Sequence, residues 1–206
     1  GQASRLGFTL AEVSVTLGII GVISAMTLPT LVKNHQRTVY VTQLQKVVND
    51  LSQAADRAIT DSNAVNLRES KFGQEGPQYL LKNYLKVAKY CDANNYTDCF
   101  ASEYKNMNGQ NLRLRAVIIT PEDGSDSCAV LASGASICMQ TPRTVNNYFG
   151  DTVISVDVNG KQGPNILGRD LFTFVMKNDD GTIITGEDME TVTSDFANSC
   201  AGATED

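Results

Sequence analysis

The sequence predicts an α+β protein in which a long N-terminal α-helix leads into a domain built on an antiparallel β-sheet. Three observations predict this class: an uncharged run of membrane length near the N-terminus, an amphipathic helical pattern directly after it, and alternating apolar and polar residues in the second half of the chain. We expect residues 8–62 to form the helix, with residues 8–32 crossing a membrane. Residues 63–206 should form a head domain whose sheet packs on the second half of the helix.

The first half of the predicted helix is uncharged from Val13 to Val32. A helix of this length rises about 30 Å, which is the thickness of the hydrocarbon core of a bilayer. Pro29 lies inside the run and removes one backbone donor, so we expect a kink or local loosening there. Glu12 places one carboxylate just before the run. A charge near the edge of a membrane helix is costly, so it either reaches the headgroups or has a dedicated partner.

The second half of the helix is amphipathic. Apolar residues recur at steps of three and four from Leu44 to Ile59, while polar and charged residues fill the other faces. This half therefore has a stripe suited to a folded domain, whereas the first half has only lipid or other copies of itself to pack against.

The remaining elements follow from local patterns. Residues 63–77 read as a linker, residues 78–90 as a short helix and residues 91–111 as a polar loop. The period then changes to two, which is typical of strands. We expect strands at residues 112–119, 127–132, 136–140, 153–158, 171–176 and 182–185, the last two joined by a turn at Asp180-Gly181, and a poorly patterned tail at residues 186–206.

Five cysteines indicate an oxidising compartment. No pair has the CxxC spacing and the sequence has one histidine, His35, so disulfides are favoured over a zinc site. The simplest pairing is local, Cys91 with Cys99 and Cys128 with Cys138, each bond stabilising the fold by about 2–3 kcal/mol. Cys200 is left over: it is free, it pairs between subunits, or the local pairing is wrong.

The first residues of the chain resemble a known family. Gly7-Phe8-Thr9-Leu10-Ala11-Glu12, followed at once by the apolar run, is similar to the N-terminus of the type IV pilin and type II secretion pseudopilin superfamily. The resemblance covers about the first 30 residues. It implies that prepilin peptidase cuts between Gly7 and Phe8 and methylates Phe8, so that residues 1–7 are part of a leader. It also implies that Glu12 pairs with the N-terminal ammonium of a neighbouring subunit, and Pro29 matches a proline common late in the family's helix.

The function implied by this resemblance is structural rather than enzymatic. Such a subunit waits in the bacterial inner membrane with an extracytoplasmic head, and an assembly platform then moves it into a periplasmic or cell-surface filament. Its expected partners are other pilin or pseudopilin subunits, prepilin peptidase, the inner-membrane assembly platform and the lipid bilayer. The formal net charge of −6 gives no basic surface for nucleic acid. The sequence does not separate pilus from secretion pseudopilus.

Two other classes stay open. One is a binding module, such as an adhesin or DNA-uptake receptor, that is merely tethered by an N-terminal anchor. The other is a membrane-anchored enzyme, although no nucleophile elbow, P-loop or dinucleotide-binding motif is present.

One loop contains oxygen-bearing side chains at a spacing compatible with a metal site. Asp157, Asn159 and Asp170 provide oxygen ligands of the kind that calcium prefers, and some pseudopilins bind calcium in a C-terminal loop. However, Lys161 and Gln162 occupy positions where an EF-hand has a ligand and a glycine. The sequence therefore favours a structural loop in which Asp and Asn side chains cap backbone amides, with no cofactor.

Overall fold

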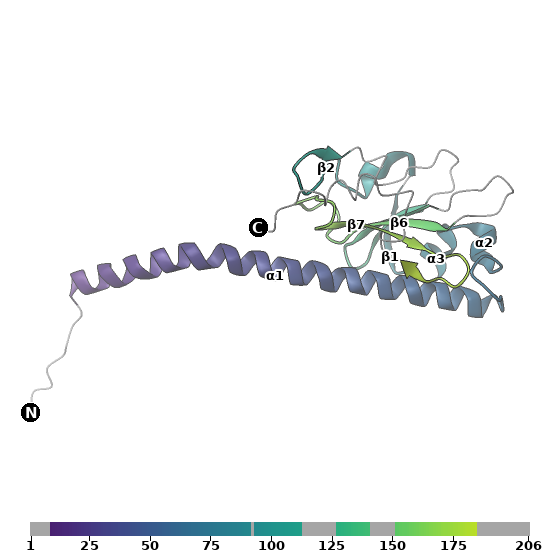
Figure 1. The fold of residues 1–206 in the computed structure, drawn as a ribbon, viewed down its shortest axis with the longest axis horizontal. Helices are drawn as coiled ribbons and strands as arrows, with labels where there is room; N and C mark the ends of the chain where they lie inside the picture. Colours follow the sequence, from purple (N-terminus) through teal and green to yellow (C-terminus); the bar gives the residue numbers. More distant parts are fainter. Residues whose placement is uncertain (1–8, 92, 113–126, 141–150, 185–206) are drawn as a thin grey trace, which may run out of the picture. The chain divides into compact units, whose positions relative to one another are not determined.

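A computed structural model describes residues 9–91, 93–112, 127–140 and 151–184 of this chain (Figure 1). Within these ranges the fold is α+β, with a long N-terminal helix followed by short helices and an antiparallel sheet. The helices are α1 (Leu10–Asp61), α2 (Lys71–Glu75), α3 (Gln78–Asn83) and the 3₁₀ helix η1 (Ala93–Asp98), and the strands are β1 (Val87–Cys91), β2 (Tyr104–Lys105), β3 (Asn111–Leu112), β4 (Ser127–Leu131), β5 (Ser136–Gln140), β6 (Thr152–Asp157), β7 (Leu171–Met176) and β8 (Ile183–Ile184).

The described strands form two sheets. The larger has six strands in the order β1-β4-β5-β6-β7-β8, and every neighbouring pair is antiparallel. The smaller sheet pairs β2 with β3. The predicted α+β class is confirmed at this level.

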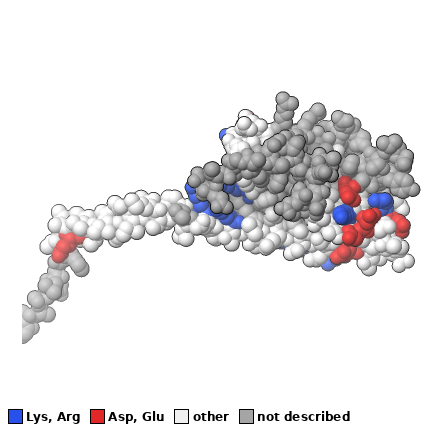
Figure 2. Space-filling view, viewed as in Figure 1, with Lys and Arg blue, Asp and Glu red and all other residues white. Residues whose placement is uncertain are grey.

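The chain divides into two compact units at the step from Val39 to Tyr40. In the described part of the first unit, α1 carries the uncharged run, and its apolar side chains are exposed. This surface is white in Figure 2 apart from one acidic area near the beginning of the helix. The helix continues through Pro29 without a break in its assignment.

In the second unit, α1 covers one face of the large sheet. Its buried residues follow the predicted amphipathic stripe: Val47, Leu51, Ala54, Ala55 and Ala58. They belong to one apolar core with sheet residues that share a face, among them Ala129, Ile137, Met139, Ile154, Val156 and Met176. The second half of the long helix therefore packs on the sheet, as its periodicity predicted.

The opposite face of the sheet carries a second apolar cluster. Side chains alternate between the faces of a strand, so the neighbours of Ala129 and Ile137 point away from α1. Cys128 and Cys138 lie on this second face and pack with residues from the segment that contains η1, β2 and β3, including Phe100 and Tyr104. The central strands β4, β5 and β6 are thus buried on both faces for most of their length, whereas edge strand β1 is largely exposed.

Two expectations for the middle of the chain were wrong. The helix expected at residues 78–90 ends at Asn83, and Val87–Cys91 forms the edge strand β1 instead. The lysines of this segment recur at a spacing typical of a helix. However, β1 pairs with β4, so the backbone of β1 has its partners 37 to 44 residues away in the sequence. The expected linker and polar loop also contain short elements, and Phe72 of α2 and Tyr104 of β2 are buried.

The later strands were predicted more closely. Strands β4 to β8 fall within a residue or two of the expected ranges, and the hairpin between β7 and β8 is present. Gly181 in its turn has a φ of +74°, and a Cβ atom there would lie 2.6 Å from the Cβ atom of Ala55 on α1. Glycine is therefore required both by the turn and by the close approach of the helix. Of the strand expected at residues 112–119, Leu112 lies in β3 and the rest lies outside the described residues, as does the expected tail.

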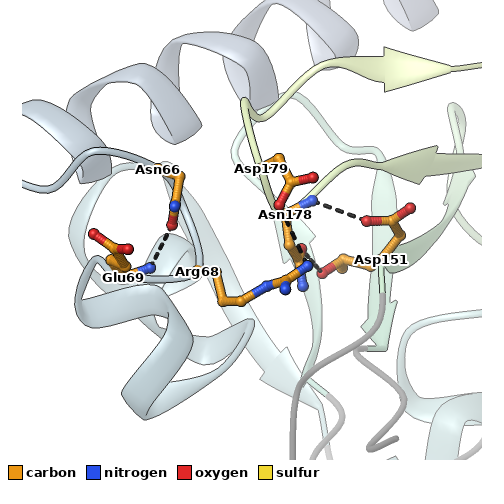
Figure 3. A network of polar contacts seen from close by, with 7 residues as sticks. Asn66, Arg68, Glu69, Asp151, Asn178 and Asp179 are labelled. Atoms are coloured by element: carbon orange, nitrogen blue, oxygen red, sulfur yellow. Dashed lines mark hydrogen bonds and ion pairs between the residues drawn. The ribbon is translucent and has the colours of Figure 1, made fainter.

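A polar network joins the segment after α1 to the β7–β8 turn (Figure 3). The backbone amides of Leu67 and Arg68 donate to the carbonyl oxygens of Asp179 and Asn178, at 3.3 and 2.9 Å. The Arg68 guanidinium lies 3.3 Å from the Asp179 carboxylate, and the backbone amide of Asn178 donates to Oδ1 of Asp151 at 3.1 Å. These contacts fix the chain where it turns back from the long helix.

Candidate functional site

The start of α1 is a capping box formed by Thr9 and Glu12. The Thr9 carbonyl accepts the first intrahelical bond, from the amide of Val13 at 3.2 Å, which makes Thr9 the N-cap residue. The Thr9 hydroxyl accepts from the Glu12 amide at 3.2 Å, and the Thr9 amide and hydroxyl both donate to Glu12 Oε2, at 2.8 and 2.9 Å. The two residues thus satisfy amides that the first turn of a helix leaves without partners.

This cap places a carboxylate at the N-terminal end of an apolar helix. The Glu12 side chain is exposed, and it sits four residues after Phe8, the expected first residue of the mature chain. The positive end of the helix dipole stabilises a carboxylate at this position. Because the side chain is exposed, a cation from outside the chain can reach it. Gly7 and Phe8 lie outside the described residues, so the expected processing site stays a prediction.

The surface that follows the cap is apolar and uncovered. An 18-residue window of α1 has a mean hydropathy of 2.0, and none of it is buried. Leu10, Leu17, Met26 and Leu31 are each more than 60% exposed. By length and composition, this is the one described helix that could cross a membrane. It is therefore a candidate membrane anchor.

The head domain contains two disulfides in its described residues, Cys91–Cys99 and Cys128–Cys138. These are the two local pairs favoured by the sequence. The first joins edge strand β1 to the residue after η1, and the second joins directly opposite residues of β4 and β5. Cys200 lies outside the described residues.

The loop between β6 and β7 is held by its own carboxylates. Asp170 is fully buried, and its two oxygens accept the backbone amides of Asn165 and Ile166, each at 2.6 Å. Asp157, also fully buried, accepts the Asn159 amide at 3.2 Å and a very short hydrogen bond from the Tyr104 hydroxyl. This is the backbone-capping role that the sequence favoured for the loop.

The same loop is joined to α1 inside the head domain. The Asn159 side-chain amide donates to the Tyr40 hydroxyl at 3.3 Å and to the Gly163 carbonyl at 3.0 Å. Burial raises the pKa of the Tyr40 hydroxyl, and the nearby charges of Asp170 and Asp157 raise it further. The loop is thus positioned by a contact with the long helix.

Calcium at this loop stays an untested alternative to the structural interpretation that the sequence favoured. The side-chain oxygens of Asn159 and Asn165 are buried without a hydrogen-bond partner. Together with the Asp157 and Asp170 carboxylates they are oxygen donors of the kind calcium uses, and these residues would hold the ion. Only two of these four oxygen donors, Asp157 and Asp170, are acidic. In the described ranges, no group of three or more His, Cys, Asp and Glu residues that could hold a metal ion occurs.

No protein-family model, curated protein or solved structure matches this chain. The interpretation of the site therefore rests on its own geometry and on the N-terminal motif.

Three polar residues of these sites were missed by sequence reasoning. The Thr-x-x-Glu spacing that begins at Thr9 is a capping-box signature that precedes an apolar run, so the role of Thr9 was accessible. The partnerships of Tyr104 with Asp157 and of Tyr40 with Asn159 had no local signal, because they join residues 53 and 119 positions apart.

The Asp157 carboxyl should make stability depend on pH. Burial raises its pKa to about 7, the Tyr104 hydrogen bond opposes this rise, and the Asp170 charge adds to it. Between roughly pH 4 and pH 7 the folded protein thus binds a proton that the unfolded chain does not. Stability should therefore fall as the pH rises through this window, and Asp170, whose pKa is also raised by burial, acts in the same direction.

Urea unfolding of the full chain in detergent, at pH 5 and pH 8, measures this effect. We expect a lower unfolding midpoint at pH 8 than at pH 5, and a smaller difference in Asp157→Asn. An equal difference in both proteins would show that the pH dependence comes from elsewhere.

Proposed function

We propose that this chain is a structural subunit of a type IV pilus-like filament or a type II secretion pseudopilus, assembled through its N-terminal helix. The observation that carries the proposal is an uncovered apolar helix of membrane length that begins with the Thr9–Glu12 capping box. Before assembly, the helix would anchor the subunit in the bacterial inner membrane, with the head outside the cytoplasm. The two disulfides of the head support an oxidising compartment.

The surface of the helix suits packing against copies of itself. Gly18 and Gly21 lie three residues apart on α1. Apart from their sequence neighbours and the adjacent backbone of the helix, no described atom lies within 4 Å of the place where their Cβ atoms would be. Small residues on an apolar helix let neighbouring backbones approach closely. In a filament, this open surface would be covered by the helices of adjacent subunits.

Glu12 would supply the specific contact of the assembly. In a bundle of apolar helices an unpaired carboxylate costs several kcal/mol, so it requires a cation. The N-terminal ammonium created by a cut before Phe8 is a cation of suitable size on an identical neighbour. The cap would aim the carboxylate toward the N-terminal side of the helix, where that ammonium would lie.

The first test is the intact mass of the protein purified from membranes of a host that contains an active prepilin peptidase. We expect a chain that begins at N-methylated Phe8, without residues 1–7. The matched control is Gly7→Leu, which should retain residues 1–7 because the peptidase of the family that the N-terminus resembles cuts after glycine.

A wild-type chain that still carries residues 1–7, in cells where the peptidase processes another substrate, would contradict the proposal. Such a result would favour a head domain that is merely tethered to the membrane, with a binding role such as that of an adhesin or DNA-uptake receptor.

A further inference from the structure

Three of the four disulfide-bonded cysteines lie in one line across the sheet. Cys91 of β1 is directly opposite Cys128 of β4, and Cys128 is directly opposite Cys138 of β5. Directly opposite residues of antiparallel strands project from the same face, with Cβ atoms about 5 Å apart. We call Cys91, Cys128 and Cys138 the cysteine row.

Only one of the two neighbouring pairs in the row is bonded. Cys128 is joined to Cys138, whereas Cys91 is joined to Cys99, which lies outside the sheet. All four cysteines belong to one apolar cluster, and the Ser136 hydroxyl donates to the Cys99 carbonyl at 2.6 Å, which holds that segment over the row. A second pairing, Cys91 with Cys128, is thus compatible with the sheet register.

The order of the three cysteines across the sheet also meets the geometric requirement of thiol–disulfide exchange. A thiolate attacks one sulfur of a disulfide and displaces the other sulfur, so the three sulfurs must come into line. Across three adjacent strands, Cys91 is on one side of Cys128 and the leaving group Cys138 is on the other.

We propose that the cysteine row is a thiol–disulfide exchange site, whose external partner is a dithiol oxidoreductase. Cys91 is the accessible entry, because it is partly exposed while the other three cysteines of the two described disulfides are at most 4% exposed. The partner dithiol reduces the Cys91–Cys99 bond and itself becomes a disulfide. Two electrons and two protons pass to the two sulfurs of this chain.

The second step needs no further oxidant or reductant. The Cys91 thiol loses its proton to solvent and attacks the Cys128 sulfur. The Cys91–Cys128 bond forms while the Cys128–Cys138 bond breaks, and Cys138 leaves as a thiolate that takes up a proton. Reduction at the edge of the sheet is thereby transferred to a buried position two strands further in.

The test uses the full chain with Cys200→Ser, so that Cys200 cannot compete, and Cys99→Ser to leave Cys91 as a free thiol. After incubation at pH 8, acid quenching and alkylation, peptide mass spectrometry measures the bonds. We expect a Cys91–Cys128 bond together with alkylated Cys138, formed faster as the pH approaches the usual thiol pKa of about 8.5.

A matched control shifts the thiol by one residue. Cys91→Ser with Tyr90→Cys, in the same background, keeps one thiol on β1 but places it on the other face of the strand, because adjacent residues alternate. The bond to Cys128 should be at least about tenfold less abundant in this control, as exchange requires an aligned thiolate. Equal abundance in the two proteins would overturn the proposal.

A second measurement uses the unaltered protein, in case Cys99→Ser prevents folding. Under limiting dithiothreitol, we expect Cys138 to become alkylated while Cys128 stays bonded, now to Cys91. Loss of the two native bonds with no Cys91–Cys128 species at any time would also overturn the proposal.

Discussion

Glu12→Gln should leave the protein in the membrane but reduce its incorporation into filaments at least tenfold. Glutamine keeps the capping box, since its side-chain oxygen still accepts from Thr9 and glutamine is a common residue at this position of the motif. What it removes is the negative charge. If that charge pairs with a neighbour's ammonium inside an apolar bundle, a loss of about 1.4 kcal/mol already corresponds to a factor of ten.

Sheared filaments and membranes, separated and quantified from cells that also express the wild-type chain, give the measurement. Thr9→Val is the complementary variant, because it removes the hydroxyl of the cap and keeps the carboxylate. We expect Thr9→Val to retain more assembly than Glu12→Gln. Glu12→Gln that assembles like the wild type would contradict the pairing role and reduce Glu12 to a helix cap.

Asp170→Ala should destabilise the head domain by about 2–4 kcal/mol. The substitution removes the acceptor of two backbone amides, those of Asn165 and Ile166, at a fully buried position. A buried donor left without a partner costs about 1–3 kcal/mol. Because the Asn165 and Ile166 amides are only partly buried, we expect a total in the lower part of the range for two donors. Asp170→Asn, which keeps one acceptor oxygen, should have an intermediate effect.

Unfolding of the full chain by urea in detergent, followed by circular dichroism, measures these differences. Asp180→Ala is the matched control, since the Asp180 carboxylate also caps a turn amide, that of Thr182 at 2.9 Å, but on the exposed surface. Its cost should stay below about 1 kcal/mol, in the range of exposed capping contacts. Equal losses at the two positions would show that burial of the loop contributes little.

The parts of the fold that the sequence predicted are those whose signals are local. The stripe on α1 that includes Leu51 and Ala55 repeats along one helix, and the hairpin at Gly181 is specified by its own turn residues. Strand β1 was missed because its partner β4 lies beyond an intervening segment, so nothing near Val87 indicates pairing.

The same reasoning divides the candidate sites. Glu12 and the two disulfides were named from motif and spacing, and Asp170 from the composition of its loop. The contacts that complete these sites come from residues whose partners lie far away in the sequence, such as Tyr104 with Asp157. Such contacts depend on the folded topology rather than on any repeating pattern.

The packing of α1 on the sheet has a consequence for biosynthesis. Leu51 is made early, but the sheet residues that share its core extend as far as Met176. Chains emerge from the ribosome N-terminus first, so the surface that covers the apolar stripe of the helix is not complete until Met176 has been synthesised. During that interval the nascent chain exposes apolar side chains along the helix. A holdase chaperone that binds amphipathic helices would cover them until the last strands have been synthesised.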